Sequence, residues 1–72
     1  MKVKLFASFR DGRFIEKEWA YSEGLTVGRI LEELAIDKKE VGVVFVNSHP
    51  AQTDYKLGEG DTLSIFPLIG GG

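Results

Sequence analysis

The chain has 72 residues, of which 43% are hydrophobic and 28% are charged, and it contains no cysteine. This length is about half that of a typical domain, so the sequence describes one small domain and excludes a multidomain enzyme. The lack of cysteine excludes thiolate-bound zinc, iron–sulfur clusters and catalytic thiols. A formal net charge of −2 gives no electrostatic reason to bind nucleic acid or an anionic membrane. The first residues alternate rather than form a long apolar stretch, so we expect no signal peptide, no membrane span and a cytoplasmic location.

Two strands are predicted at the start of the chain. Residues 2–9 alternate between apolar and polar side chains, with Phe6 as the exception in the polar phase. Asp11-Gly12 is a tight-turn dipeptide, and residues 13–21 alternate again, with Ile15, Trp19 and Tyr21 in one phase. The chain therefore opens with a predicted hairpin. Lys17 falls in the apolar phase of the second strand, which favours a place at the edge of the sheet.

One helix follows. Thr26 is the expected N-cap, because apolar residues then recur at helical spacing and give the helix one buried stripe. The preceding Leu25 can pack on Ile30 as a hydrophobic staple. We expect this helix to end near residues 35–37.

Three further strands are expected after the helix. The β-branched run at 41–46 predicts a well-covered strand, and residues 47–50 form a turn cluster. A short extended piece is expected around 51–53. A last strand at 62–66 has Leu63 and Ile65 in one phase and Phe66 in the other.

This order of elements predicts an α+β fold of the β-grasp, ubiquitin-like type. It has a mixed sheet of four to five strands covered by one main helix, with the last strand returning beside the first. We expect residues 1–69 to form a single domain and residues 70–72 a flexible glycine tail.

Side chains suited to catalysis are scarce in this sequence. His49 is the one histidine and stands before Pro50 in a turn, where an exposed side chain is the simplest interpretation. Gly58 and Gly60 lack the lysine and hydroxyl of a phosphate-binding loop, so they are interpreted as turn residues. No metal site and no catalytic residue is predicted. Acidic residues are spread over turns and outer faces, where they serve solvation: Asp11, Glu16, Glu18, Glu32, Glu33, Glu59 and Asp61.

The C-terminus is the first unusual feature. After Pro67 and Leu68, the chain ends in Gly70-Gly71-Gly72. Three terminal glycines arise by chance in only roughly three or four chains in ten thousand. Without side chains, such a tail can thread a narrow channel and bring its carboxylate to a nucleotide phosphate in another protein. The alternative is a frayed end without function.

The second unusual feature is the pair Phe6 and Phe66, each in the polar phase of its strand. If the first and last strands are neighbours, the two rings lie together on the open face of the sheet, beside the start of the tail. Such a patch is suited to docking a partner. The alternative is that the rings fold over the sheet edge and complete a thin core.

Several fragments, taken in order, resemble the small sulfur-carrier family of the molybdopterin synthase small subunit (MoaD) and the thiamine-biosynthesis carrier (ThiS). The resemblance runs over the whole length and rests on five segments: Val3 to Arg10, Leu25-Thr26-Val27, Val46-Asn47, Leu57 with Gly60-Asp61, and Phe66-Pro67 followed by Gly71-Gly72. Phe66-Pro67 looks more like the molybdopterin branch. Leu68, where a second proline is common, and the third glycine, Gly70, are departures from that branch.

The resemblance implies a carried substrate rather than an enzyme. A ubiquitin-activating-type enzyme would adenylate Gly72 with ATP and magnesium, and the carboxylate would become a thiocarboxylate that donates sulfur in molybdopterin biosynthesis. The chain itself would bind no cofactor. Gly70 and Gly71 would thread the partner's active site, and partner docking would use Phe6, Phe66, Pro67 and Leu68.

The implied partners are the adenylating enzyme, a sulfur donor of the cysteine desulfurase or rhodanese type, and the large subunit of molybdopterin synthase or thiazole synthase. The free chain is expected to be a monomer. Three alternatives stay open: a carrier for thiamine-thiazole synthesis, a ubiquitin-like modifier joined to lysines, and a noncovalent interaction module.

Overall fold

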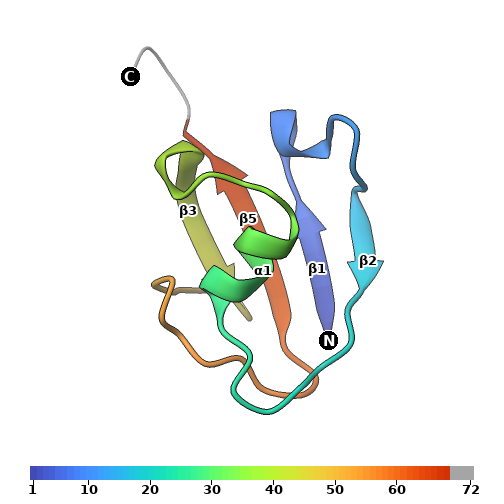
Figure 1. Cartoon of the computed structure of the whole chain (residues 1–72), viewed down its shortest axis with the longest axis vertical. Coiled ribbons are helices and arrows are strands. Elements are labelled where there is room, and N and C mark those ends of the chain that lie inside the picture. The colour runs from blue at the N-terminus through green and yellow to red at the C-terminus, as the bar shows by residue number, and fades with distance from the viewer. Residues whose placement is uncertain (69–72) are drawn as a thin grey trace.

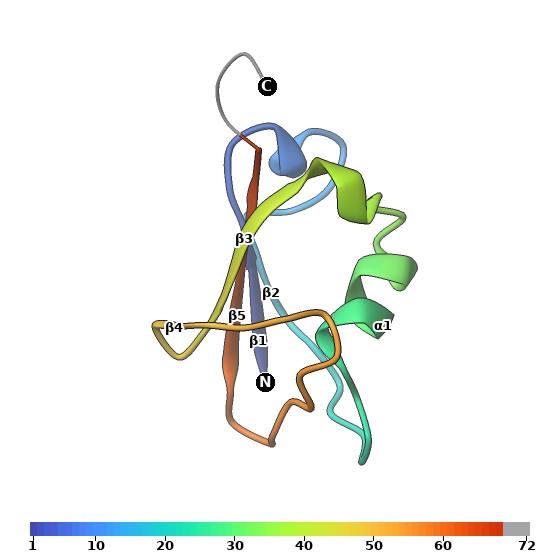
Figure 2. The same ribbon diagram turned by 90° about the vertical axis from the view of Figure 1, so that its left-hand side faces the viewer.

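A five-stranded mixed sheet forms one layer and a single α-helix covers one of its faces (Figures 1 and 2). The computed structural model describes residues 1–68. In chain order the elements are β1 (Lys2–Leu5), the 3₁₀ helix η1 (Ala7–Arg10), β2 (Glu16–Glu18), α1 (Val27–Glu33), the 3₁₀ helix η2 (Lys38–Glu40), β3 (Val41–Val46), β4 (His49–Pro50) and β5 (Thr62–Pro67).

The strands lie in the order β2-β1-β5-β3-β4. β1 pairs with β5 in parallel, whereas the other neighbouring pairs are antiparallel. The last strand therefore returns beside the first, and the predicted β-grasp fold is confirmed.

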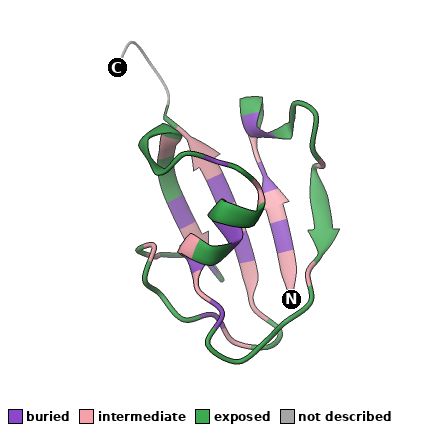
Figure 3. Cartoon of the chain, in the orientation of Figure 1, coloured by how far each residue is buried: buried purple, intermediate pink, exposed green. Residues whose placement is uncertain are grey.

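The core lies between the sheet and α1. Val3 and Leu5 of β1 and Leu63 and Ile65 of β5 are fully buried, so the two central strands contribute alternate residues to one face (Figure 3). From the helix, the stripe predicted by its spacing is also fully buried: Val27, Ile30 and Leu31. Burying side chains of this kind stabilises the fold by about 1.5–3 kcal/mol each.

The start of α1 is as predicted. Thr26 has extended backbone, and its side chain accepts a hydrogen bond from the Arg29 amide at 3.2 Å, so it is the N-cap. The helix ends at Glu33, two residues before the expected region, because Ala35 takes a left-handed conformation (φ +58°). No helix within residues 1–68 is long and apolar enough to cross a membrane.

The predicted opening hairpin is wrong in its bounds. β1 ends at Leu5, because Ala7 has a φ of +52° and starts η1, from which Phe9 enters the core. β2 spans only Glu16–Glu18, and Ile15 is 62% exposed instead of sharing a buried phase with Trp19. The edge position predicted from Lys17 is confirmed, since β2 is the outermost strand on its side.

Two expectations about the later strands also need correction. β3 is not well covered, because Gly42 and Val43 are exposed and only Val44 and Val46 are buried. The short strand is His49–Pro50 instead of 51–53, since Asn47 and Ser48, both with positive φ, complete the turn before it. His49 therefore lies in β4 opposite Val46, exposed as expected.

Candidate functional site

Three phenylalanines form a cluster on the face of the sheet opposite α1, which we call the outer aromatic cluster (Phe6, Phe45 and Phe66). The rings of Phe6 and Phe66 are stacked, with centroids 4.1 Å apart and planes inclined by 11°. Phe45 meets Phe66 edge to face, at a centroid distance of 5.8 Å and an angle of 88°. Both geometries are favourable for aromatic pairs. The side-by-side placement of Phe6 and Phe66 that the sequence predicted is therefore present.

The outer aromatic cluster follows from strand alternation. Leu63 and Ile65 face α1, so Phe66 faces the other way, and Phe45 lies between the buried Val44 and Val46 in the same manner. All three rings are half-buried, and none of them packs against the core residues between the sheet and α1. They are thus a satellite cluster and do not extend the main core.

A cation and a shallow hollow border the outer aromatic cluster. The Arg10 guanidinium lies over the Phe6 ring, 5.2 Å from its centroid, and its Nε donates a hydrogen bond to the Leu5 carbonyl at 2.6 Å. On the other side, Ser48 and Ser64 line a hollow together with Phe45 and Phe66. Half-buried aromatics beside an arginine have the composition of a protein interface.

The tail begins at the same end of the sheet. Pro67 ends β5 opposite Val41 and is half-buried, whereas Leu68 is 62% exposed. Phe6 stacks on Phe66, and Pro67 and Leu68 follow Phe66 directly in the chain; the docking role predicted for these four residues stays a prediction. Gly70, Gly71 and Gly72, the predicted tail and modified residue, lie outside the described residues.

Sequence analysis missed two members of this site. Phe45 was hidden because the run 41–46 is almost uniformly apolar and therefore has no readable phase. Arg10 was hidden because its position depends on η1, which the alternating pattern did not predict. No signal in the sequence could have found Phe45, because Val44, Phe45 and Val46 are all apolar.

Asp61 and Asn47 lie in segments that resemble the sulfur-carrier family, and their side chains form hydrogen bonds near the start of β5. The Asp61 carboxylate accepts hydrogen bonds from Asn47 Nδ2 and from the Gly58 amide, both at 2.7 Å. Asn47 Oδ1 in turn accepts one from the Thr62 amide at 3.0 Å. These contacts tie the loop before β5 to the turn after β3, which is a structural role.

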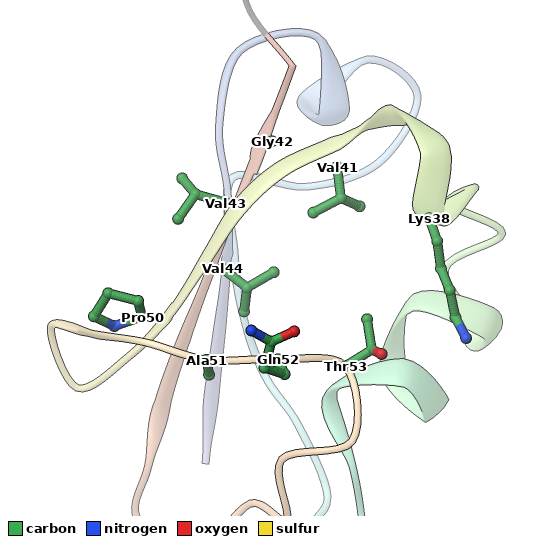
Figure 4. A pocket seen from close by; sticks show the side chains of 9 residues that line it. All are labelled: Lys38, Val41, Gly42, Val43, Val44, Pro50, Ala51, Gln52 and Thr53. Carbon is green, nitrogen blue, oxygen red and sulfur yellow. The ribbon is translucent and has the colours of Figure 1, made fainter.

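A second hollow, on the α1 side of the sheet, holds little chemistry. It lies beside β3 (Figure 4), and of its nine lining residues only Lys38 is charged. Within residues 1–68, no three His, Asp or Glu side chains lie close enough together to hold a metal ion. Among the described residues, the outer aromatic cluster is therefore the candidate site.

The fold and the site define a class of protein, a ubiquitin-like β-grasp domain with an aromatic outer face, and the sequence of this chain ends in glycines. The sequence profile of the ThiS family matches residues 3–72, so the chain belongs to this family of small carrier-type proteins. Family members work with activating enzymes and with large subunits. No curated protein matches the chain.

Solved structures agree with this assignment. A protein of Pyrococcus furiosus with the provisional name molybdopterin converting factor, subunit 1, is 32% identical, with 94% of this chain and 95% of that chain covered and a TM-score of 0.73. SAMP1 from Haloferax volcanii is 25% identical over 99% and 97% of the two chains, with a TM-score of 0.73. The HVO 2177 protein of the same organism is 28% identical over 99% and 84%, with a TM-score of 0.75.

Proposed function

We propose that this chain is a sulfur carrier for molybdopterin biosynthesis, whose terminal Gly72 is activated and converted to a thiocarboxylate. The observation that carries the proposal is the extent of the family match, which continues to Gly72 itself. The name of the Pyrococcus furiosus structure supports the molybdopterin branch.

The chemistry requires activation, sulfur transfer and reduction, and all three steps take place on partner enzymes. A Gly72 carboxylate oxygen attacks the α-phosphorus of ATP, which releases pyrophosphate and gives an acyl-adenylate. A sulfur donor's persulfide then attacks the carbonyl carbon, and AMP leaves. A thiol reduces the resulting acyl disulfide, so the sulfur stays on Gly72 as a thiocarboxylate. Activation is needed because a carboxylate is a poor electrophile until its oxygen leaves as part of AMP.

The described residues support the carrier's part in this scheme, which is to dock and present the tail. The stacked Phe6 and Phe66 rings offer the partner an aromatic surface, and Pro67 and Leu68 lead from it directly into the tail. One partner contact at the outer aromatic cluster would therefore place the tail at the partner's active site.

The test is adenylation by the cognate activating enzyme, measured as ATP–pyrophosphate exchange that depends on this chain. We expect exchange with the wild-type chain and none with a chain extended by one alanine after Gly72. In the extended chain the Gly72 carboxylate has become part of a peptide bond and cannot attack ATP. Glu59→Gln, an exposed change in the loop before β5, is the matched control and should exchange normally. Full exchange by the extended chain, without trimming, would contradict the proposal.

A sulfur carrier and a ubiquitin-like modifier differ in the group that attacks the activated Gly72 carboxyl. This group is sulfur for a carrier and a lysine amine for a modifier. Incubation with activating enzyme, sulfur donor and a target protein should yield thiocarboxylate. An amide bond between Gly72 and a lysine would instead identify a modifier.

A further inference from the structure

Gly42 is the extra residue of a β-bulge where β3 meets the end of β5. Val41 pairs with Pro67 and Val43 with Phe66, so two steps along β3 correspond to one step along β5. Figure 4 shows the consequence, with Val41 and Val44 pointing to one side of β3 and Val43 to the other. A bulge of this kind bends its strand and redirects what lies next to it.

Glycine is required here by close approach of the backbones. A Cβ atom at Gly42 would lie 2.6 Å from the Pro67 carbonyl oxygen, 3.0 Å from its carbon and 3.2 Å from Leu68 Cα. All three are backbone atoms, so no flexible side chain can move aside. Any other residue at position 42 must therefore displace the chain at Pro67 and Leu68.

A hydrogen bond fixes the same segment from the neighbouring element. The Leu68 amide donates to the carbonyl of Glu40, the last residue of η2, at 2.8 Å. Pro67 is thus packed against Gly42 and Leu68 is bonded to Glu40, and we call these four residues the tail clamp. Leu68 is mostly exposed, so its side chain contributes little to holding this position.

The tail clamp limits where the reactive end can go. Four residues follow Leu68, and a fully extended chain of that length spans at most about 14 Å. Release of Pro67 and Leu68 would leave six residues, instead of four, between the last fixed position in the sheet and the C-terminal carboxylate, and would remove the fixed starting direction. Loss of position by as little as about 1 Å can cost an enzyme about 100-fold in rate.

We propose that Gly42 is a positioning residue for activation of Gly72: its missing side chain lets the tail clamp form, so the tail leaves the sheet from a fixed point beside Phe66. This inference rests on the proposed function. We call Gly42 a positioning residue and not a catalytic one, because it acts through Pro67 and Leu68.

The test compares Gly42→Ala with Gly58→Ala. The second variant is the matched control, because a Cβ at Gly58 would meet its nearest neighbour, Asp61 Oδ2, at an ordinary 3.5 Å. Two quantities are measured in full-length protein. One is amide hydrogen exchange of Leu68, with Leu63 and Ile65 as internal references, and the other is kcat and KM for adenylation by the activating enzyme.

We expect Gly42→Ala to speed exchange of the Leu68 amide about tenfold or more while the Leu63 and Ile65 amides keep their protection. We expect kcat to fall by about tenfold or more, with KM changed by less than about two-fold, because the outer aromatic cluster still docks. Gly58→Ala should change neither quantity. A merely destabilised fold would instead expose all three amides and raise KM.

A second change keeps the inference testable if Gly42→Ala folds poorly. One glycine inserted between Leu68 and Ile69 shifts the carboxylate relative to the fixed starting point and leaves the fold untouched, so kcat should fall. In the double variant the two losses should be less than multiplicative, since both act on the position of the tail.

Wild-type kcat in either single variant would overturn the positioning role, as would a protected Leu68 amide in Gly42→Ala. These results leave the proposed function standing. A wild-type chain that is not adenylated at all would instead overturn the proposed function, and the positioning role with it.

Discussion

Replacement of Phe66 by alanine separates the outer aromatic cluster from the core. Full burial of a phenylalanine side chain contributes about 1.5–3 kcal/mol, and Phe66 is only half-buried. Its stacking on Phe6 at 4.1 Å adds about 0.5–1.5 kcal/mol beyond the buried area. We therefore expect Phe66→Ala to lower the free energy of unfolding by about 1–3 kcal/mol. Leu63→Ala, at a fully buried position in the same strand, should cost about 2–5 kcal/mol.

A double-mutant cycle isolates the stack itself. Phe6→Ala, Phe66→Ala and the double variant are unfolded in urea, with Trp19, the one tryptophan, as the fluorescent probe. The loss of stability in the double variant should be smaller than the sum of the two single losses by about 0.5–1.5 kcal/mol. The reason is that either single change already removes the stacking. A coupling of zero would show that the rings do not stack in solution. A cost for Phe66→Ala equal to that of Leu63→Ala would place the ring in the core.

The same variants should bind the activating enzyme differently. Phe66→Ala should lose about 2 kcal/mol of affinity, or about 30-fold in Kd, as an anchor residue of an interface does. Tyr55→Ala is the matched control, since it also removes an exposed aromatic side chain, but beside the start of α1, whose amide at Val27 donates to the Tyr55 carbonyl. Equal affinity of the two variants would show that partners dock elsewhere.

Two further predictions concern the hydrogen bonds that shape the fold. Thr26→Ala should cost about 1 kcal/mol in urea unfolding through loss of the cap on α1, while Thr26→Ser should retain most of it; equal losses in both would refute the capping role. Asp61→Ala should cost about 1–3 kcal/mol, because it leaves Asn47 Nδ2 and the Gly58 amide without their acceptor; a change within about 0.5 kcal/mol would show that water replaces the carboxylate.

Those parts of the fold that have a strong local pattern could be predicted from the sequence. Thr26 begins α1 because a hydroxyl before an apolar stripe satisfies a free amide, and Leu63 alternates with Phe66 because strand side chains point to opposite faces. The neighbouring positions of Phe6 and Phe66 followed from that alternation together with the topology of the β-grasp fold. In each case one local rule and the global fold agreed.

The missed features depend on tertiary contacts. η1 begins at Ala7 in a left-handed conformation, which nothing in an alternating segment favours, and it is accompanied by burial of Phe9. The bulge at Gly42 could not be predicted from the sequence. The valines around it show no alternation of polar and apolar residues that a bulge would interrupt. The need for glycine is seen only in the structure, where the Pro67 carbonyl occupies the space that a side chain at position 42 would take.

The most direct test of the carrier role is the intact mass of the protein purified from its native host under conditions that preserve thiocarboxylates. The account predicts a fraction whose mass has increased by the difference between sulfur and oxygen, with fragmentation placing that change on Gly72. This fraction should disappear when the activating enzyme is deleted. A chain that carries only the ordinary carboxylate, in cells that are actively making the sulfur-containing cofactor, would contradict the account.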